Sequence, residues 1–136
     1  MSIQWNYKIQ LKNTEIFEKI ENDNGIKVPN ELRTFIEANN GAYPTPNCVD
    51  INGEERVYDA TLSFNEKEED ATTFLFAMKV VANPDYIPFA QDPFGNYYCY
   101  EWKNKTVSFY NHEDEMMDDT EVGLDAFIKS FHEPRE

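Results

Sequence analysis

The chain has 136 residues, enough for one domain with its own core, and its 26 acidic residues against 12 basic ones give a formal net charge of −14. Because contacts with phosphates and with anionic lipid headgroups depend on lysine and arginine, this charge argues against binding to nucleic acid or to a membrane surface. The charge favours a basic protein as partner, although an acidic surface also serves simply to keep a protein soluble.

The first residues and the cysteines predict a cytoplasmic protein. The opening stretch MSIQWNYKIQ has neither the basic start nor the apolar run of a secretory leader, and no segment approaches the roughly 20 apolar residues of a membrane span. Cys48 and Cys99 are therefore expected to be reduced thiols. Cys99 lies in an aromatic strand pattern that predicts burial, whereas Cys48 follows two prolines in a stretch that allows exposure.

Two amphipathic helices are predicted near the start of the chain. The first is capped by Asn13 or Thr14 and stops at Asn24-Gly25, and its apolar face consists of Ile16, Phe17 and Ile20. The second begins at Pro29, where a missing N–H costs little, and stops at Asn40-Gly41. Its apolar face consists of Leu32, Phe35 and Ile36.

The middle of the chain mixes loops with short apolar segments. Residues 43–53 are rich in Pro, Asn and Gly and predict a surface loop with a short extended piece at most. Residues 57–64 alternate and predict a strand with Tyr58, Ala60, Leu62 and Phe64 on one face and Asp59, Thr61 and Ser63 on a wet face. Residues 65–70 form a charged, solvated loop. Residues 72–83 fit either a buried helix or a strand, and we favour the helix.

A meander of at least three antiparallel strands follows. Residues 87–90 are extended, and Asp92-Pro93-Phe94-Gly95 fits a type I turn with Asp first, Pro second and Gly fourth. Residues 97–102 and 106–110 alternate as strands on either side of a turn at 103–105. Phe89, Tyr98 and Tyr100 are expected in the core. Asp92 is interpreted as the acid that forms the turn, with projection towards a partner as the alternative.

The tail is acidic and then helical. After the polar stretch 112–123, an apolar stripe of Leu124, Phe127, Ile128 and Phe131 predicts a closing helix, capped by Asp119 or Thr120. No linker or repeat divides the chain. The order of elements predicts an α+β fold with a single domain over residues 1–136, in which an antiparallel sheet, a meander, is flanked by N-terminal helices and a C-terminal helix.

Two motifs stand out in this order of elements. The first is the apolar-Pro pair Val28-Pro29, which leads into a helix ending in Asn40-Gly41, and the second is IPFAQDPFGNYY at residues 87–98. With the closing helix, they resemble the SUKH superfamily, which includes yeast cell-wall regulators and many bacterial immunity proteins. The similarity spans nearly the whole chain and implies a SUKH-like fold. One departure is Ala42-Tyr43, where family members often carry a second Gly.

The candidate binding residues are acidic. The stretch from 113 to 125 contains no Lys or Arg, and it is interpreted either as a solvated loop and helix start or as a surface that faces a partner. Its acidic residues are Glu113, Asp114, Glu115, Asp118, Asp119, Glu121 and Asp125. The predicted partner-binding residues are Asp92, Glu113, Asp114, Glu115, Asp118 and Asp119.

No catalytic, cofactor-binding or metal-binding residue is predicted. Asp50-Ile51-Asn52-Gly53-Glu54-Glu55 is too short a fragment of a calcium loop, and His112 and His132 lack zinc-ligand spacing, so both histidines are expected to have structural or surface roles. The serines have no Gly-x-Ser-x-Gly context and there is no glycine-rich phosphate loop, so an enzyme is not expected.

The resemblance implies a binding role. Small bacterial members of the superfamily typically neutralise a polymorphic toxin encoded nearby, frequently a nuclease. A nuclease domain is commonly basic because it must attract phosphate, so an acidic inhibitor could occupy its groove. The sequence thus predicts an immunity protein that acts by stoichiometric occlusion. The alternative is a non-catalytic regulatory scaffold that binds an endogenous protein.

Overall fold

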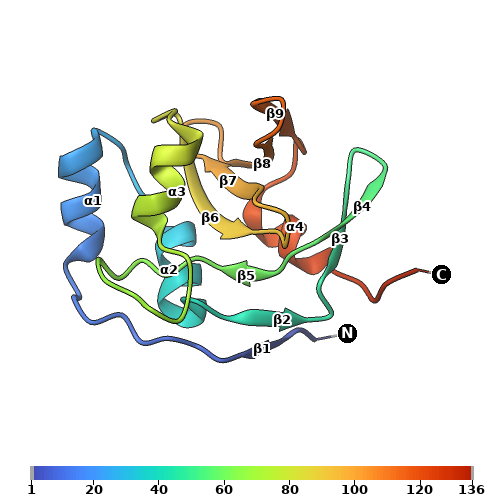
Figure 1. Cartoon of the computed structure of the whole chain (residues 1–136), viewed down its shortest axis with the longest axis horizontal. Coiled ribbons are helices and arrows are strands. Elements are labelled where there is room, and N and C mark those ends of the chain that lie inside the picture. Colours follow the sequence, from blue (N-terminus) through green and yellow to red (C-terminus); the bar gives the residue numbers. More distant parts are fainter. Residues whose placement is uncertain (1, 136) are drawn as a thin grey trace.

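A five-stranded antiparallel sheet forms the centre of the structure, a computed structural model that describes residues 2–135 (Figure 1). Its strands lie in the order β5 (Ala60–Thr61), β6 (Tyr86–Gln91), β7 (Tyr97–Glu101), β8 (Thr106–Asn111) and β9 (Met116–Asp119). Two antiparallel ribbons accompany it, β1 (Gln4–Asn6) with β2 (Tyr43–Thr45) and β3 (Cys48–Ile51) with β4 (Glu54–Val57). The predicted α+β fold with an antiparallel meander is confirmed.

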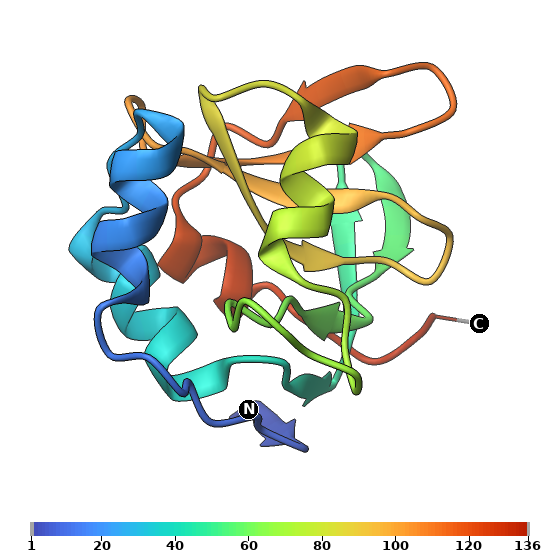
Figure 2. The same cartoon turned by 60° about the vertical axis from the view of Figure 1, so that its left-hand side comes forward.

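Four helices surround the sheet: α1 (Ile16–Asn24), α2 (Asn30–Asn39), α3 (Phe74–Val81) and α4 (Leu124–Lys129). Figure 2 shows α3 across one face of the sheet, while α2 and α4 lie on the other side. On that second side the Tyr98 ring lies 5.6 Å from the ring of Phe127 in α4, and the Tyr100 hydroxyl donates to Glu31 of α2 at 2.8 Å. None of the helices in residues 2–135 combines the length and the apolar composition that a bilayer crossing requires.

The two N-terminal helices are confirmed, with a shift of one residue at each start. Glu15 stands at the N-cap of α1, and Asn13 accepts the Glu15 N–H at 2.9 Å just before it. Pro29 is the residue that precedes α2. Gly25 ends α1 in the left-handed conformation with φ +65°, which is why glycine suits this position.

Residues 72–83 contain a helix, as favoured. The Thr73 hydroxyl accepts the Phe76 N–H at 3.1 Å and caps α3. Phe74, Ala77 and Val81 are buried at helical spacing against the sheet, and Phe76 is 57% exposed. An apolar residue on the solvent side hides the amphipathic pattern, so periodicity alone does not separate this helix from a strand.

The prediction of a surface loop at residues 43–53 is wrong. Strands β2 and β3 lie here, and Cys48, Val49 and Ile51 are buried, so the exposure considered for Cys48 is not found. The turn between β3 and β4 is Asn52-Gly53, with φ values of +49° and +88°. This dipeptide is the strongest short-range hairpin signal, because both central residues of a type I′ turn need positive φ.

The wet face predicted for residues 57–64 is also wrong. Strand β5 comprises only Ala60–Thr61, and both Thr61 and Ser63 are buried. The segment after α2 covers this side of the chain: the Thr61 N–H donates to Ala42 at 2.9 Å, and the Asn40 side chain donates to the Ser63 hydroxyl at 3.4 Å. The alternating pattern predicted that water would solvate these polar groups. In the structure, hydrogen bonds within the protein take the place of that water.

The meander from residue 87 to residue 110 is confirmed as β6, β7 and β8, and Phe89, Tyr98, Cys99 and Tyr100 are fully buried. The acidic tail holds one strand more than predicted, because β9 pairs with β8 from Ser108↔Asp119 to Asn111↔Met116. The predicted cap of the last helix is wrong. Gly123 is the N-cap of α4. The Thr120 hydroxyl instead donates to the Val107 carbonyl in β8 at 2.6 Å, just after the end of β9.

Candidate protein-binding surface

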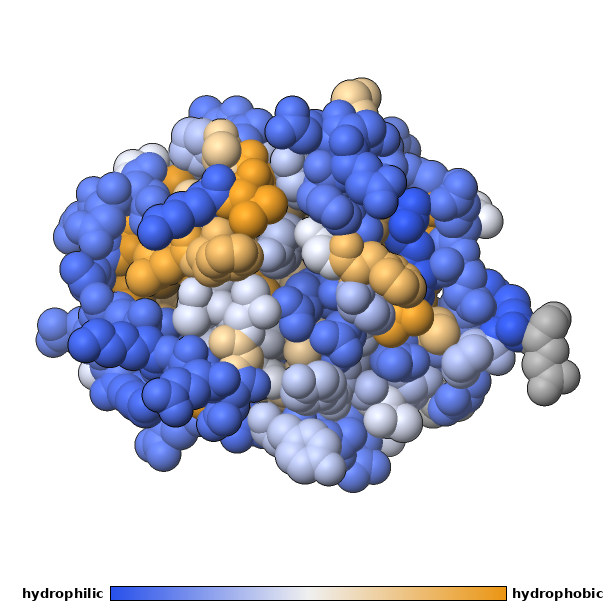
Figure 3. Space-filling model, viewed as in Figure 1, coloured by the Kyte–Doolittle hydropathy of each residue, from blue (hydrophilic) through white to orange (hydrophobic). Residues whose placement is uncertain are grey.

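The most concentrated charge lies on what we call the acidic hairpin, formed by β8, β9 and the turn at residues 112–115. From Thr106 to Ile128 the sequence contains no Lys or Arg. Five of the predicted binding residues are exposed here: Glu113, Asp114, Glu115, Asp118 and Asp119. Figure 3 shows hydrophilic atoms over the region of β8 and β9, whereas apolar atoms gather over α3 and between α3 and α1.

Short polar side chains shape the turn of the acidic hairpin. Asn111 accepts the Glu113 N–H at 3.0 Å, and Asp114 accepts the Met116 N–H at 2.9 Å. Such side chain-to-backbone bonds stabilise tight turns. Within residues 2–135, no salt bridge involves any of the five acidic residues, so the charge of the acidic hairpin is not neutralised inside the molecule.

The strand register divides these carboxylates between two faces. Asp118 lies opposite Phe109, on the side where the guanidinium of Arg56 covers the Phe109 ring at 4.3 Å. Asp119 lies opposite Ser108, on the other side, with its carboxylate 3.5 Å from the Thr106 hydroxyl. Because neighbouring residues of a strand point to opposite faces, a partner that covers one face meets only part of the predicted set, together with the turn.

Asp92 lies apart from the acidic hairpin surface and is only 4% exposed. Its carboxylate accepts the backbone N–H groups of Phe94 and Asn96 at 2.8 and 2.9 Å and the Asn96 side-chain amide at 2.8 Å. Its interpretation as the acid that forms the turn is confirmed. The Asn96 side-chain oxygen accepts the His112 N–H at 3.0 Å, so Asp92 is connected to the start of the acidic turn.

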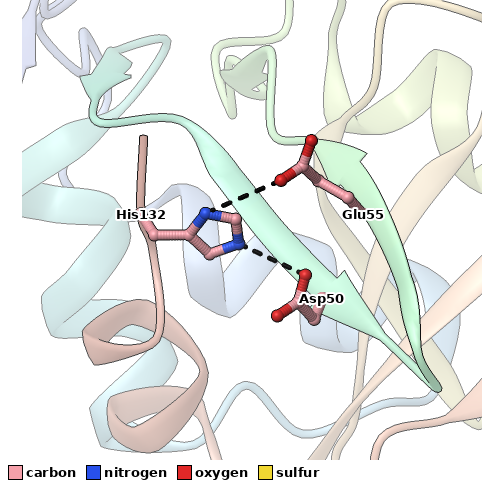
Figure 4. A group of neighbouring side chains, drawn as sticks. All are labelled: Asp50, Glu55 and His132. Atoms are coloured by element: carbon pink, nitrogen blue, oxygen red, sulfur yellow. Dashed lines mark hydrogen bonds and ion pairs between the residues drawn. The ribbon is translucent and has the colours of Figure 1, made fainter. Parts of the chain in front are cut away.

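A second cluster, absent from the sequence prediction, joins the C-terminal tail to the β3–β4 ribbon (Figure 4). His132 lies between two carboxylates, with Nε2 3.2 Å from Asp50 Oδ1 and Nδ1 3.8 Å from Glu55 Oε1. The backbones of His132 and Cys48 exchange two hydrogen bonds, of 2.8 and 3.0 Å. No motif spacing finds this cluster, because 82 residues separate Asp50 from His132.

The histidine–carboxylate cluster has the geometry of a metal site, but the Arg135 side chain already supplies a positive charge there. One ligand atom each from Asp50, Glu55 and His132 lie within 4.8 Å of one another, which is close enough to surround a metal ion. The guanidinium of Arg135, however, donates to both Asp50 oxygens at 2.7 and 2.9 Å. A metal ion would have to displace this bidentate bond, so the arrangement serves first to hold the tail against the ribbon.

Arg135→Ala is expected to raise the pKa of Asp50 towards its ordinary value of 3.8, since hydrogen bonds from Arg135, and then from His132, hold it lower in the folded protein. A carboxylate with a depressed folded pKa stabilises its attachment above the ordinary value and loses this contribution as pH falls through the folded value. In the variant the tail should detach at a higher pH. The carboxyl ¹³C shift of Asp50, titrated by NMR, measures this.

Lys129→Ala is the matched control, because Lys129 pairs with Asp125 at 2.9 Å within α4. This variant removes one exposed cation from the same end of the chain without touching Asp50. An Asp50 pKa that is the same in Arg135→Ala and in the wild type would show that the guanidinium does not bind Asp50 in solution.

A hollow of about 510 Å³ lies between α2 and α4, and unlike the acidic hairpin it has carboxylates that are paired within the molecule. Its apolar walls include Phe35 and Ile128. Its two carboxylates have partners inside the molecule, since Glu31 accepts the Tyr100 hydroxyl and Asp125 pairs with Lys129. The acidic hairpin is therefore the better candidate for a charged partner.

The comparisons with known proteins agree with the fold. The model of the SMI1 / KNR4 family (SUKH-1) matches residues 13–130, from just before α1 to the end of α4. No curated protein matches the chain. The matched range includes α2 with its Asn40-Gly41 end, the turn at Asp92 and the whole acidic hairpin.

Proposed function

Because the chain belongs to the SMI1 / KNR4 family (SUKH-1), we propose that it is an immunity protein that neutralises a bacterial polymorphic toxin. Family membership is consistent with this role, and it favours binding of a partner protein over catalysis. The partner is a basic toxin domain, and a nuclease domain fits best because it must carry positive charge to bind phosphate. The protein binds it one to one and occludes its active groove.

The observation that carries this proposal is the unpaired charge of the acidic hairpin. Carboxylates without internal partners attract a positive surface from a distance and can raise association rates by about 10- to 1,000-fold. Acids that are already in salt bridges contribute less to such a field. The turn Glu113–Glu115 places three exposed acidic residues next to one another in the sequence.

Neutralising the turn with Glu113→Gln, Asp114→Asn and Glu115→Gln is expected to slow association with the toxin domain about tenfold at low ionic strength. The partner is the domain encoded next to the gene, with its active site inactivated, and stopped-flow kinetics give the rate. Thermal unfolding should change little because the three side chains are exposed.

The control removes the same amount of charge elsewhere, with Glu66→Gln, Glu69→Gln and Asp70→Asn in the exposed loop before α3. Equal slowing by both triple variants would assign the effect to net charge alone and not to the acidic hairpin. A wild-type rate that does not change with salt would refute electrostatic capture. No complex with the toxin domain would favour a regulatory role with an endogenous partner.

A further inference from the structure

A cavity of about 290 Å³ opens between the C-terminal end of α3 and the acidic hairpin. Figure 2 shows this end of α3 beside β8 and β9. The helix and the residues after it form one wall, and the hairpin forms the other. The cavity is lined by Val80, Val81, Ala82, Asn83, Tyr110, Glu115 and Met117.

Most of the side chains that line this cavity are apolar or aromatic. Tyr110 and Met117 are paired across β8 and β9, so their side chains stand on the same face of the sheet and point towards α3. Val81 and Tyr110 are buried, and Val80 and Met117 are half-buried. A long aliphatic or planar side chain entering here would lose contact with water along most of its length.

The polar end of the cavity is negative. Glu115 is the one ionisable carboxylate in the lining, and it sits at φ +59° on the hairpin turn. The last carbonyl groups of α3 have no helical N–H partners and carry the partial negative charge of a helix C-terminus. Burial, and after it the negative charge of Glu115, raises the pKa of Tyr110. No lysine or arginine lines the cavity in the described part of the chain.

We propose that this cavity receives an arginine side chain of the partner protein. The aliphatic stem packs between Val80 and Met117, and the guanidinium bonds to Glu115 and to carbonyl oxygens at the end of α3. A planar guanidinium also fits against the Tyr110 ring, an arrangement that arginine adopts more often than lysine. The inference rests on the proposed function, because a basic toxin domain supplies such a side chain.

The pocket is tested without any toxin, using N-acetyl-arginine amide and methyl NMR. Millimolar concentrations should shift the methyl signals of Val80, Val81 and Met117 in a saturable way. N-acetyl-citrulline amide, which has nearly the same shape but no charge, should not shift them. Equal shifts with citrulline, or none with arginine, would overturn the proposal, and equal affinity for N-acetyl-lysine amide would overturn the choice of arginine.

Glu115→Gln should weaken the binding of N-acetyl-arginine amide about tenfold, because it removes the charge from a charge-assisted hydrogen bond. Glu113→Gln is the matched control: it makes the same change on the same turn, outside the cavity lining. Both variants keep the backbone and nearly the same side-chain size, and thermal unfolding confirms that they fold. Equal weakening by the two variants would assign the effect to general charge.

With the toxin domain, Glu115→Gln should raise the dissociation rate about tenfold, whereas Glu113→Gln should leave it nearly unchanged. If the toxin domain binds and both variants dissociate at the wild-type rate, the pocket proposal fails and the proposed function stands. If N-acetyl-arginine amide binds and the toxin domain does not, the pocket stands and the proposed function fails.

Discussion

Asn40→Ala is expected to lower the free energy of unfolding by about 3–5 kcal/mol, a large part of the stability of a domain this size. Asn40 is 2% exposed, and its side chain joins the end of α2 to two other segments, one at Ile9 and one at residues 63–64. Its oxygen accepts the Phe64 N–H at 2.8 Å, and its amide donates to the Ile9 carbonyl at 3.1 Å and to the Ser63 hydroxyl at 3.4 Å. Alanine leaves the buried Phe64 N–H without its acceptor and also removes the bonds to the Ile9 carbonyl and the Ser63 hydroxyl.

Asn39→Ala is the matched control for this prediction. Asn39 is the preceding asparagine and is 9% exposed, yet within residues 2–135 its side chain makes none of these connections. Urea unfolding followed by tryptophan fluorescence gives both free energies. Losses of similar size in the two variants would mean that burial, and not the Asn40 hydrogen bonds, holds the segments together.

The same bonds explain why an Asn-Gly pair ends α2. Gly41 has φ +68°, and a Cβ there would lie 2.6 Å from the Cδ1 of Ile9. The pair therefore turns the chain tightly while Asn40 binds the N-terminal segment and the residues that follow β5. The sequence motif marked the end of a helix, but its burial depends on contacts 23 and 31 residues away.

The sequence predicts correctly those helices and turns whose shape depends on residues that are close together in the chain. The helices α1 and α2 carry their own stop signals and apolar stripes, and the turn at Asp92 carries its own acid, proline and glycine. β9 was missed because its strand, MMDD, has almost no apolar alternation. It is a strand because β8 offers it a free edge, and its charges protect the new edge from further pairing.

The candidate site shows the same division. The sequence alone predicts the charge of the turn Glu113–Glu115, because a run of acidic residues can be identified without knowing its tertiary contacts. The assignment of Asp118 and Asp119 to opposite faces needs the strand register. The cavity under Glu115 needs the position of α3, and the histidine–carboxylate cluster needs the tail to return to β3. None of these placements has a local signal.

Asp92→Ala is expected to lower the free energy of unfolding by about 2–4 kcal/mol, because two backbone N–H groups and one amide lose an ionised acceptor. Asp92→Asn should cost less, since one oxygen remains for the backbone N–H groups. Urea unfolding measures both. Equal losses in the two variants would show that the charge of Asp92, and not its geometry, stabilises the turn.

The effect of Asp92→Ala should extend to the acidic hairpin. Asn96, which Asp92 holds by two bonds, accepts the His112 N–H at 3.0 Å, and the His112 ring lies 3.4 Å from where a Cβ on Gly95 would be. Loosening Asn96 removes the support for residue 112, so amide exchange at Glu113–Glu115 should accelerate before the whole domain unfolds. Unchanged exchange there would show that the turn holds its shape alone. With acceleration, Asp92 would influence partner binding by positioning the acidic turn and not by touching the partner.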